Sequence, residues 1–386
     1  MKKLLISLLA IFAAVSASAQ YNYPNSGNND VLLPAMRNTI NGRTEIYIPQ
    51  VNGYNVYKAD LHVHTICSDG RVTPDYRVRE AWFDGLDIMA IADHMEYRRY
   101  EPRFIAYLQD YFPEAVKVDN KSKDASEIKV DLNYSVNWAL KYTKDYPVLI
   151  IPAAEITRGE GHYNVLFTTD NNTIPNKDAL QAIRNAKAQG CLIQHNHPGK
   201  RRSTVEMSEF EKTAYAEGLI DGVEVMNGGE FYPKMTDRAS EYGLFMSSNT
   251  DIHWTSKNDY QGAQLGRNMT LILAKENTLE AIREALEAKR TICYSFDRFA
   301  GEESLLKDLF NACVKFSVIS RNEKKGTTTF ALTNMSSLPF VVSIPGSSPE
   351  WVDPFTTIKL TCKDLKLEVQ NMWCGANTHP IIDVKF

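Results

Sequence analysis

Residues 60–65 read Asp60-Leu61-His62-Val63-His64-Thr65, and the run that leads into them from Tyr57 is typical of a buried strand. Because side chains alternate along a strand, His62 and His64 are expected on the same face. Two imidazoles side by side at the C-terminal end of a strand can share one metal ion. Asp69 follows in a Ser-Asp-Gly turn and adds a carboxylate to the same region.

The remaining histidines repeat this arrangement. Seven of the eight fall in five short blocks, each at or just after the end of an apolar run, and only His379 lies outside them. A single histidine on an apolar face is usually a satisfied core residue. Five blocks at strand ends with carboxylates beside them instead predict metal ligation. The blocks contain His62 and His64; His94; His162; His195 and His197; and His253.

Strands and helices alternate through the first three quarters of the chain. Repeating β-α units are typical of a parallel sheet, and about seven of them closing on themselves form a barrel with its chemistry at the C-terminal strand ends. All five histidine blocks are expected there. The predicted strands are 57–64, 87–94, 148–156, 163–168, 191–195, 221–226, 245–248, 270–274 and 292–295. The predicted helices are 74–84, 102–112, 125–144, 177–189, 205–217, 234–242, 279–289 and 302–312.

The pattern changes after residue 300. Six short β-like runs with turns between them predict a small antiparallel β domain, of sandwich type, in which Trp351 and Trp373 are expected to be core residues. The predicted organisation is a signal peptide at 1–19, an extended arm at 20–55, a domain of β-α units with the histidine blocks at 56–300 and a β-sandwich-like domain at 301–386.

Composition limits the function classes. With 386 residues and a net charge of −4, the chain has no basic footprint for nucleic acid, and no internal stretch is apolar enough to span a membrane.

The N-terminus is typical of a removable secretory signal: it has Met1-Lys2-Lys3, then an apolar run, then Ala17-Ser18-Ala19. This signal predicts a periplasmic or secreted protein. Cys362 and Cys374 could then form a disulfide, but their spacing does not decide it.

Nine residues are candidate metal ligands. Imidazole and carboxylate together suit Zn²⁺, Mn²⁺ or Fe²⁺, and nine ligands are too many for one ion, so two or three divalent ions are expected. An excess of cationic charge in such a pocket favours an anionic substrate, and a phosphate ester fits. The candidate ligands are His62, His64, Asp69, His94, Glu155, His162, His197, Asp251 and His253.

Five motifs in this order resemble the PHP superfamily of metal-dependent phosphoesterases: His-x-His after the first strand, Asp-His, Glu, His-Pro and a late Asp-x-His. The resemblance spans about residues 57–300 and implies a distorted (β/α)7 barrel with three metal sites. It assigns one ion to His62, His64, Glu155 and Asp251. Glu155 would bridge to a second ion completed by His162 and His197, and the third would take Asp69, His94 and His253. Some family members have His where this chain has Asp69.

Three further predictions concern catalysis and substrate binding. A metal-bridging hydroxide would attack phosphorus, while Asp251, His253 or His195 manages the proton. His195 is expected on the same face as His197, as support for a ligand or as a phosphate contact, and Asp93 is expected to support a ligand rather than to be one. Basic residues that follow the blocks suit phosphate binding, although such runs are often solvated loops. They are Arg98, Arg158, Lys200, Arg201 and Arg202.

The sequence thus predicts an exported phosphoesterase acting on phosphodiesters or small organophosphates. A phosphomonoesterase of the same fold and a non-catalytic, metal-stabilised binding protein remain alternatives. A nucleic-acid enzyme is disfavoured by the acidic balance and the export signal, and the oligomeric state is not predicted.

Overall fold

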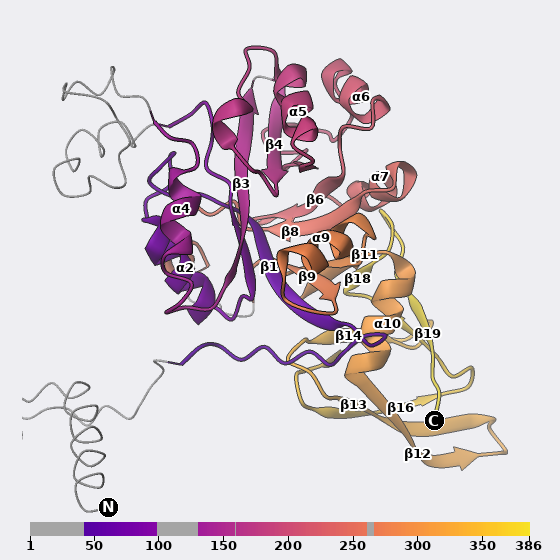
Figure 1. The fold of residues 1–386 in the computed structure, drawn as a ribbon. Coiled ribbons are helices and arrows are strands. Elements are labelled where there is room, and N and C mark those ends of the chain that lie inside the picture. Colours follow the sequence, from indigo (N-terminus) through magenta and orange to yellow (C-terminus); the bar gives the residue numbers. More distant parts are fainter. Residues whose placement is uncertain (1–41, 99–129, 159, 261–265) are drawn as a thin grey trace, which may run out of the picture. The chain divides into compact units, whose positions relative to one another are not determined.

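A computed structural model describes residues 42–98, 130–158, 160–260 and 266–386 (Figure 1). The chain divides into two units, Met1–Gly42 and Arg43–Phe386, and the second contains almost all the described residues. The predicted signal peptide and the predicted helix at 102–112 lie outside the described residues.

One large sheet forms the centre of the Arg43–Phe386 unit. It has 12 strands in the order β18-β11-β10-β9-β1-β2-β3-β4-β5-β6-β7, with β8 paired to β6. Most predicted strands are present within a few residues of their expected bounds. The strands are β1 (Asn55–Val63), β2 (Ile88–Ile91), β3 (Leu149–Arg158), β4 (Gly161–Leu166), β5 (Leu192–His195), β6 (Gly222–Asn227), β7 (Glu230–Phe231), β8 (Phe245–Asn249), β9 (Met269–Ala274), β10 (Thr291–Ser295), β11 (Arg298–Gly301) and β18 (Met372–Trp373).

The sheet is mixed, so the prediction of a parallel sheet holds only in part. β1-β2-β3 and β5-β6-β8 pair in parallel, whereas β4 is antiparallel to both β3 and β5, and β9 is antiparallel to β1. No helix separates β3 from β4, and a connection of two residues can join only antiparallel strands. A regular seven-unit barrel is therefore not what the structure shows.

The sheet nevertheless curls back on itself at the end that carries the histidine blocks. The N–H of Asp251, just after β8, donates to the carbonyl of His62 at 2.9 Å, and the N–H of His64 donates to the carbonyl of Ile252 at 3.1 Å. These two bonds bring the end of β8 against the end of β1, although the two strands are distant in sequence.

Most helices of the described residues lie at the predicted places, but η2 and α8 were not predicted, and of the predicted helix 125–144 only 134–140 is helical in the described part. Their starts follow local capping rules: Ser208 and Glu211 form a capping box at α6, and the Asp178 and Thr278 side chains cap α5 and α9. The helices of the main part are α2 (Pro74–Phe83), α4 (Tyr134–Leu140), the 3₁₀ turn η2 (Asn171–Thr173), α5 (Ala179–Ala188), α6 (Glu209–Ala216), α7 (Lys234–Tyr242), α8 (Ser256–Asp259), α9 (Leu279–Glu287) and α10 (Glu303–Cys313).

The C-terminal part consists of small antiparallel sheets, as predicted. One has the order β12-β13-β16 and the other β15-β14-β17-β19. Trp351 is 55% exposed, so its prediction as a core residue is wrong. The strands are β12 (Val314–Asn322), β13 (Thr327–Asn334), β14 (Phe340–Ser343), β15 (Glu350–Val352), β16 (Thr357–Cys362), β17 (Lys366–Val369) and β19 (Ile381–Asp383).

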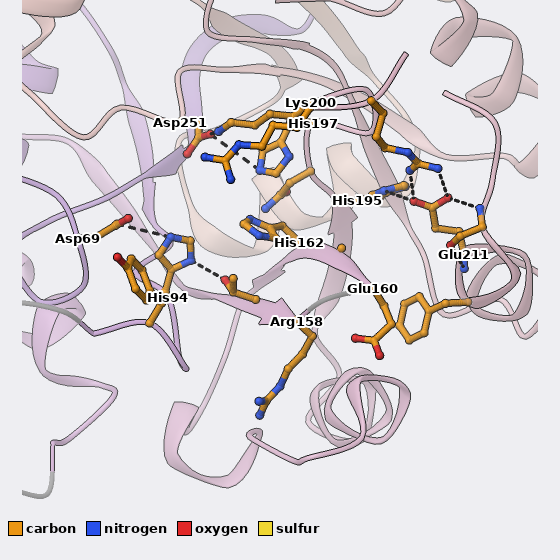
Figure 2. Close-up of a pocket in the computed structure, with 18 of the residues that line it drawn as sticks. Asp69, His94, Arg158, Glu160, His162, His195, His197, Lys200, Glu211 and Asp251 are labelled. Atoms are coloured by element: carbon orange, nitrogen blue, oxygen red, sulfur yellow. Dashed lines mark hydrogen bonds and ion pairs between the residues drawn. The ribbon is translucent and has the colours of Figure 1, made fainter. Parts of the chain in front are cut away.

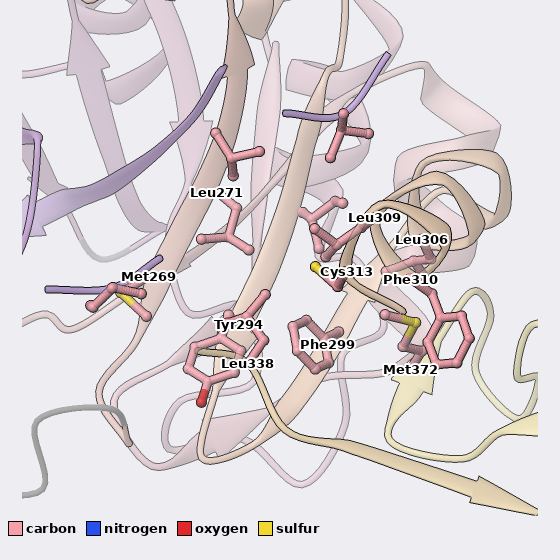
Figure 3. Close-up of a cluster of buried hydrophobic side chains, with 14 of the residues drawn as sticks. Met269, Leu271, Tyr294, Phe299, Leu306, Leu309, Phe310, Cys313, Leu338 and Met372 are labelled. Carbon is pink, nitrogen blue, oxygen red and sulfur yellow. The ribbon is translucent and has the colours of Figure 1, made fainter. Parts of the chain in front are cut away.

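The C-terminal strands share a core with the main sheet. Phe299 of β11 and Phe310 of α10 both pack against Phe340 of β14, with ring centroids 5.7 and 5.0 Å apart. Figure 3 shows Phe299 and Phe310 together with Leu338 and Met372 in this cluster. Met372 and Trp373 also form β18, which pairs in parallel with β11. One buried cluster therefore connects the two parts.

The described end of the arm contacts both parts. The N–H of Thr44 donates to the carbonyl of Phe83, and the N–H of Ser337 donates to the carbonyl of Tyr47. Cys362 and Cys374 are free thiols. Among the described helices, none has the length and apolar character that crossing a membrane requires.

Candidate metal centre

The two histidines of β1 point into one cluster, at the end of the strand. His62 and His64 are both fully buried, and their Nε2 atoms are 3.1 Å apart. Val63, between them, faces the hydrophobic core instead. The alternation expected from the sequence is therefore present, and it directs both rings to the same point.

β3 brings a buried carboxylate to the two imidazoles. Glu155 is 0% exposed, and its Oε1 lies 3.5 Å from His62 Nε2 while its Oε2 lies 3.7 Å from His64 Nε2. The Asn196 side-chain amide donates to Oε1 at 2.9 Å and fixes the carboxylate. Glu155 is thus held between several imidazoles.

Asp251 approaches the same pair from the end of β8. Its Oδ1 is 3.0 Å from His64 Nε2 and 3.4 Å from His62 Nε2. The residue has a φ of 52°, in the left-handed region that Asp tolerates better than most residues. This conformation turns the chain as it leaves the strand. The Lys200 ammonium forms an ion pair with Oδ2.

Asp69 lies close to a second group of imidazoles. Its Oδ1 is 3.2 Å from His253 Nε2, 3.5 Å from His94 Nε2 and 3.9 Å from His64 Nδ1. The Asp69 loop is anchored from behind by Asp93, whose carboxylate accepts from the Thr65 backbone N–H and other groups of the loop. Asp93 therefore supports the loop and does not face the cluster.

His162 and His197 approach the same Glu155 oxygen that faces His62. His162 Nδ1 is 3.1 Å and His197 Nε2 is 3.9 Å from Glu155 Oε1. His162 comes from β4, next to Glu155 in the β3-β4 hairpin. His197 follows β5 with a φ of 28°, again in the left-handed region.

Seven of these nine side chains form three overlapping groups in which the ligand atoms lie within 4.8 Å of one another, and Asp251 and His197 belong to none of the three. Figure 2 shows the part of the cluster that faces the cavity. His64 Nδ1 is buried without a hydrogen bond, and the contacts of Glu155 Oε2 are to the imidazoles of His64 and His94, as expected of atoms available to a cation. The residues present therefore fit divalent metal ions. The groups are His64, Asp69, His94 and His253; His62, His64 and Glu155; and His94, Glu155 and His162.

The electrostatics of the cluster reflect crowded carboxylates and imidazoles in a dry site. Burial lowers the pKa of His197 to about 4, and burial with neighbouring imidazoles lowers that of His64 to about 4. Burial opposes charge on His94 too, but Glu155 and Asp69 raise its pKa to about 10. Burial disfavours ionised Glu155, yet the surrounding imidazoles hold its pKa well below the usual range. Closely spaced carboxylates thus create a strong demand for positive charge.

Sequence reasoning missed Glu224 of β6. This carboxylate is 0% exposed, and its Oε1 is 2.9 Å from His62 Nδ1. The sequence feature that could have indicated Glu224 is its position as a single acidic residue between Val223 and Val225, in an otherwise apolar strand. Glu155 has the same feature, and there the order of the motifs also identified it as a candidate ligand.

The prediction that His195 shares a face with His197 is wrong. His195 Nδ1 is 2.9 Å from the Tyr215 hydroxyl, and Nε2 is 3.4 Å from Glu211 Oε1, so the ring contacts α6 rather than the imidazole cluster. Strand alternation does not extend to His197, because its left-handed backbone redirects the chain after β5. The catalytic role of His195 stays a prediction.

The basic residues predicted to bind phosphate differ in their hydrogen-bond and ion-pair partners. Lys200 pairs with Asp251, Arg202 donates to Glu211 Oε1 at 2.7 Å, and Arg158 pairs with Glu96 at 3.0 Å. Arg98 donates to the His94 carbonyl at 2.9 Å.

A cavity of about 950 Å³ connects the cluster to the basic loop. Asp69, His94 and Asp251 lie at one side, and Glu211 at the other (Figure 2). Arg202 donates to Glu211 and also lines the cavity. Arg158, Lys200 and Arg201 also line it, but Arg98 is not among its lining residues. Tyr97 and Phe210 add aromatic surface. The opening is large enough for a substrate well beyond the size of inorganic phosphate.

Comparison with solved structures gives an extensive match. A two-domain protein of Bacteroides vulgatus, described as containing a predicted PHP-like metal-dependent phosphoesterase, shares 30% sequence identity at a TM-score of 0.77, over 90% of this chain and 100% of that chain. No protein-family model and no curated protein matches this chain.

Two other solved structures match more weakly. A protein of Bifidobacterium adolescentis described as a metal-dependent phosphoesterase has 16% identity and a TM-score of 0.35, over 52% of this chain and 88% of that one. A lesion-specific endonuclease of Pyrococcus furiosus has 16% identity and a TM-score of 0.41, over 64% and 59%.

Proposed function

Because this chain belongs to the family of PHP-like metal-dependent phosphoesterases, we propose that it hydrolyses phosphodiesters or small organophosphates with the help of two or three divalent ions. The observation that carries the proposal is the convergence of His62, His64, Glu155 and Asp251 from three separate strands, beside a cavity lined by basic residues. A purely structural site would tend to be closed and rich in cysteine.

The proposed ligand sets are those that the family resemblance implies. His62, His64, Glu155 and Asp251 would hold one ion. Glu155 would also serve a second ion, completed by His162 and His197. Asp69, His94 and His253 would hold the third. Zn²⁺, Mn²⁺ and Fe²⁺ all accept such mixed imidazole and carboxylate ligands.

Each part of the site has a chemical task in this proposal. Bound divalent ions would supply Lewis-acid chemistry: they would neutralise phosphoryl oxygens and make a water molecule acidic enough to act near neutral pH. Lys200 and Arg201 would bind the anionic substrate from the rim. Asp251 and His253 would accept a proton from water or return it to the leaving alcohol.

Hydrolysis of bis(p-nitrophenyl) phosphate and p-nitrophenyl phosphate with added Mn²⁺ or Zn²⁺ tests this proposal. We expect metal-dependent release of p-nitrophenol, faster from the diester, that is lost in His62→Ala and retained in His379→Ala. Faster release from the monoester would favour the phosphomonoesterase alternative. Bound metal without hydrolysis of any ester would favour a binding protein.

The substrate is proposed to be a small ester rather than nucleic acid. The net charge of −4 provides no general attraction for a polyanion. Including a single-stranded and a duplex oligonucleotide in the same panel tests this point, and cleavage of either would contradict it.

Export and domain organisation complete the proposal. Cleavage after Ala19 would release the mature protein into the periplasm or the medium. Amino-terminal sequencing of the protein from a cell fraction is expected to begin at Gln20. We further propose that the curled sheet corresponds to a distorted seven-unit barrel, with residues 56–300 as the hydrolase domain and 301–386 as a β-sandwich-like domain packed against it.

A further inference from the structure

Glu224 is a buried carboxylate that the proposed ligand sets do not use. It lies in the middle of β6, is 0% exposed and is not among the residues that line the cavity. Direct contact with a substrate is therefore excluded by its position. An ionised carboxylate in such a place is costly unless it has several partners.

Its two oxygens contact two different candidate ligands. Oε1 lies 2.9 Å from His62 Nδ1, and Oε2 accepts from the backbone N–H of His197 at 2.7 Å. One side chain therefore holds the ring of one residue and the main chain of another.

Three side-chain amides complete its surroundings. Asn249 donates to Oε1 at 3.0 Å and Gln194 at 3.4 Å, while Asn227 donates to Oε2 at 2.8 Å. Asn249 also accepts from the Leu61 N–H at 2.8 Å, one residue before His62. The network leaves the carboxylate little freedom to rotate, because β1, β5 and β6 all contribute to it.

The contact with His62 decides which ring nitrogen faces the cluster. A carboxylate can only accept, so the proton between the two groups belongs to His62 Nδ1. Nε2 is then the nitrogen directed at His64, Glu155 and Asp251, at 3.1, 3.5 and 3.4 Å. Carboxylates that hold a metal-binding histidine in this way also raise the basicity of its free nitrogen.

The contact with His197 supports a strained backbone. A φ of 28° lies outside the favoured regions for a residue with a side chain. The hydrogen bond from its N–H to Glu224 helps to hold the turn that points the imidazole back toward Glu155.

We propose that Glu224 is a positioning residue of the metal centre: it sets the orientation and proton position of His62 and holds the backbone of His197, so that both present Nε2 to the ions. This inference rests on the proposed function, because it assumes that His62 and His197 bind metal.

Zinc titration of the purified full-length protein, followed calorimetrically, tests the proposal with Glu224→Gln. The amide keeps the shape of the side chain but cannot accept at both ends. We expect the affinity of the sites containing His62 and His197 to fall about 10- to 100-fold, the usual cost of losing such a partner. Glu211→Gln is the matched control, since Glu211 is equally buried but contacts His195 and Arg202; its zinc affinity should equal that of the wild type.

Nuclear magnetic resonance of zinc-loaded wild-type protein with ¹⁵N-labelled histidine gives a second, mutation-free test. His62 is expected to carry its proton on Nδ1 and to bind through Nε2. The opposite arrangement would overturn the proposal, even if Glu224→Gln failed to fold. Equal zinc affinity in folded Glu224→Gln and wild type would also overturn it while leaving the proposed function intact. A wild type that binds no zinc, manganese or iron would instead remove the proposed function itself.

Discussion

Glu155 and Glu224 are single carboxylates within apolar strands, and both are completely removed from water. At the scale of the residue, these two side chains lower the stability of the fold, because burying an ionised carboxylate costs several kcal/mol unless neighbouring groups compensate. Imidazoles and amides supply that compensation here. The site is thus prepared by its own residues before any ligand enters, and single substitutions should expose the cost.

The first prediction at this scale concerns His62. We expect His62→Ala to lose most bound metal and at least about 100-fold in phosphoesterase activity, because the imidazole contacts both Glu155 and Asp251. Metal content by mass spectrometry and turnover of bis(p-nitrophenyl) phosphate measure the two effects. His379→Ala, the one histidine outside the blocks, serves as control. Unchanged metal content in His62→Ala would show that the cluster is not the binding site.

The second prediction concerns pH. Burial would raise the pKa of Glu211, but His195 and Arg202 lower it to about 2. The ring of Tyr163, in β4, packs against Phe210, which precedes Glu211 in α6. Because the folded-state pKa lies below the unfolded value of about 4.3, the stabilisation is fully present above that value and is lost as the pH falls toward 2.

The difference in melting temperature between wild type and Glu211→Gln measures the stabilisation that ionised Glu211 provides. This difference should be constant from pH 7 to about 5 and should shrink steadily from there to pH 2. A difference that grows on acidification would contradict the assignment of an ionised Glu211.

At the scale of the element, the hydrophobic pattern predicts most strands and helices of the described chain. Examples are β1, α2 and α10, whose bounds differ from the expected ones by only a few residues. The missed strands are the short β7, β11, β15 and β18; β7 and β18 have two residues each and exist only because a partner strand lies beside them. Such pairing depends on tertiary contacts, which local periodicity does not contain.

The same limit applies to the site. Residue types and spacing indicate the candidate ligands, because metal chemistry restricts which side chains can serve. Glu224 and the turned backbone of His197 could not be predicted, since their roles arise from residues that meet only after β5, β6 and β1 are assembled. Pairing direction was also missed where two strands follow each other without a helix.

A prediction at this scale concerns the loop that carries Asp69. A Cβ on Gly70 would lie 2.7 Å from the carbonyl carbon of His64 and from the N atom of Thr65, so the backbone must shift. Gly70→Ala should therefore displace Asp69, weaken metal binding and cost about 1–3 kcal/mol of stability. Urea denaturation and metal titration measure the two effects.

Gly229→Ala is the comparison for this variant. A Cβ there meets nothing within 4 Å, so it should leave both quantities nearly unchanged. Equal behaviour of the two variants would mean that the close approach at Gly70 has no consequence.

At the scale of the whole described unit, the buried cluster in Figure 3 joins the C-terminal strands to the main sheet. Phe340 is central to it, with Phe299 on one side and Phe310 on the other. The short strand β18 adds main-chain pairing to the same boundary. Folding of the small sheets and of the large sheet should therefore be coupled.

The corresponding prediction is a single cooperative unfolding transition for the wild type. Phe340→Ala should lower the stability of the whole unit by about 3–5 kcal/mol, without separating the transition into two. Calorimetry and urea denaturation followed by circular dichroism and tryptophan fluorescence provide the measurement. Two transitions, of which only one responds to Phe340→Ala, would show that the parts unfold independently.

The left-handed backbone at His197 and Asp251 also restricts how this protein can be altered by evolution or in the laboratory. Asn, Asp, His and Gly tolerate that conformation better than other residues, and β-branched residues least. In a saturation library, Val or Ile at either position would carry a folding defect as well as a chemical one, and the two would be confounded. Asparagine separates them, because it accepts the same turn while removing the charge of Asp251 or the imidazole of His197.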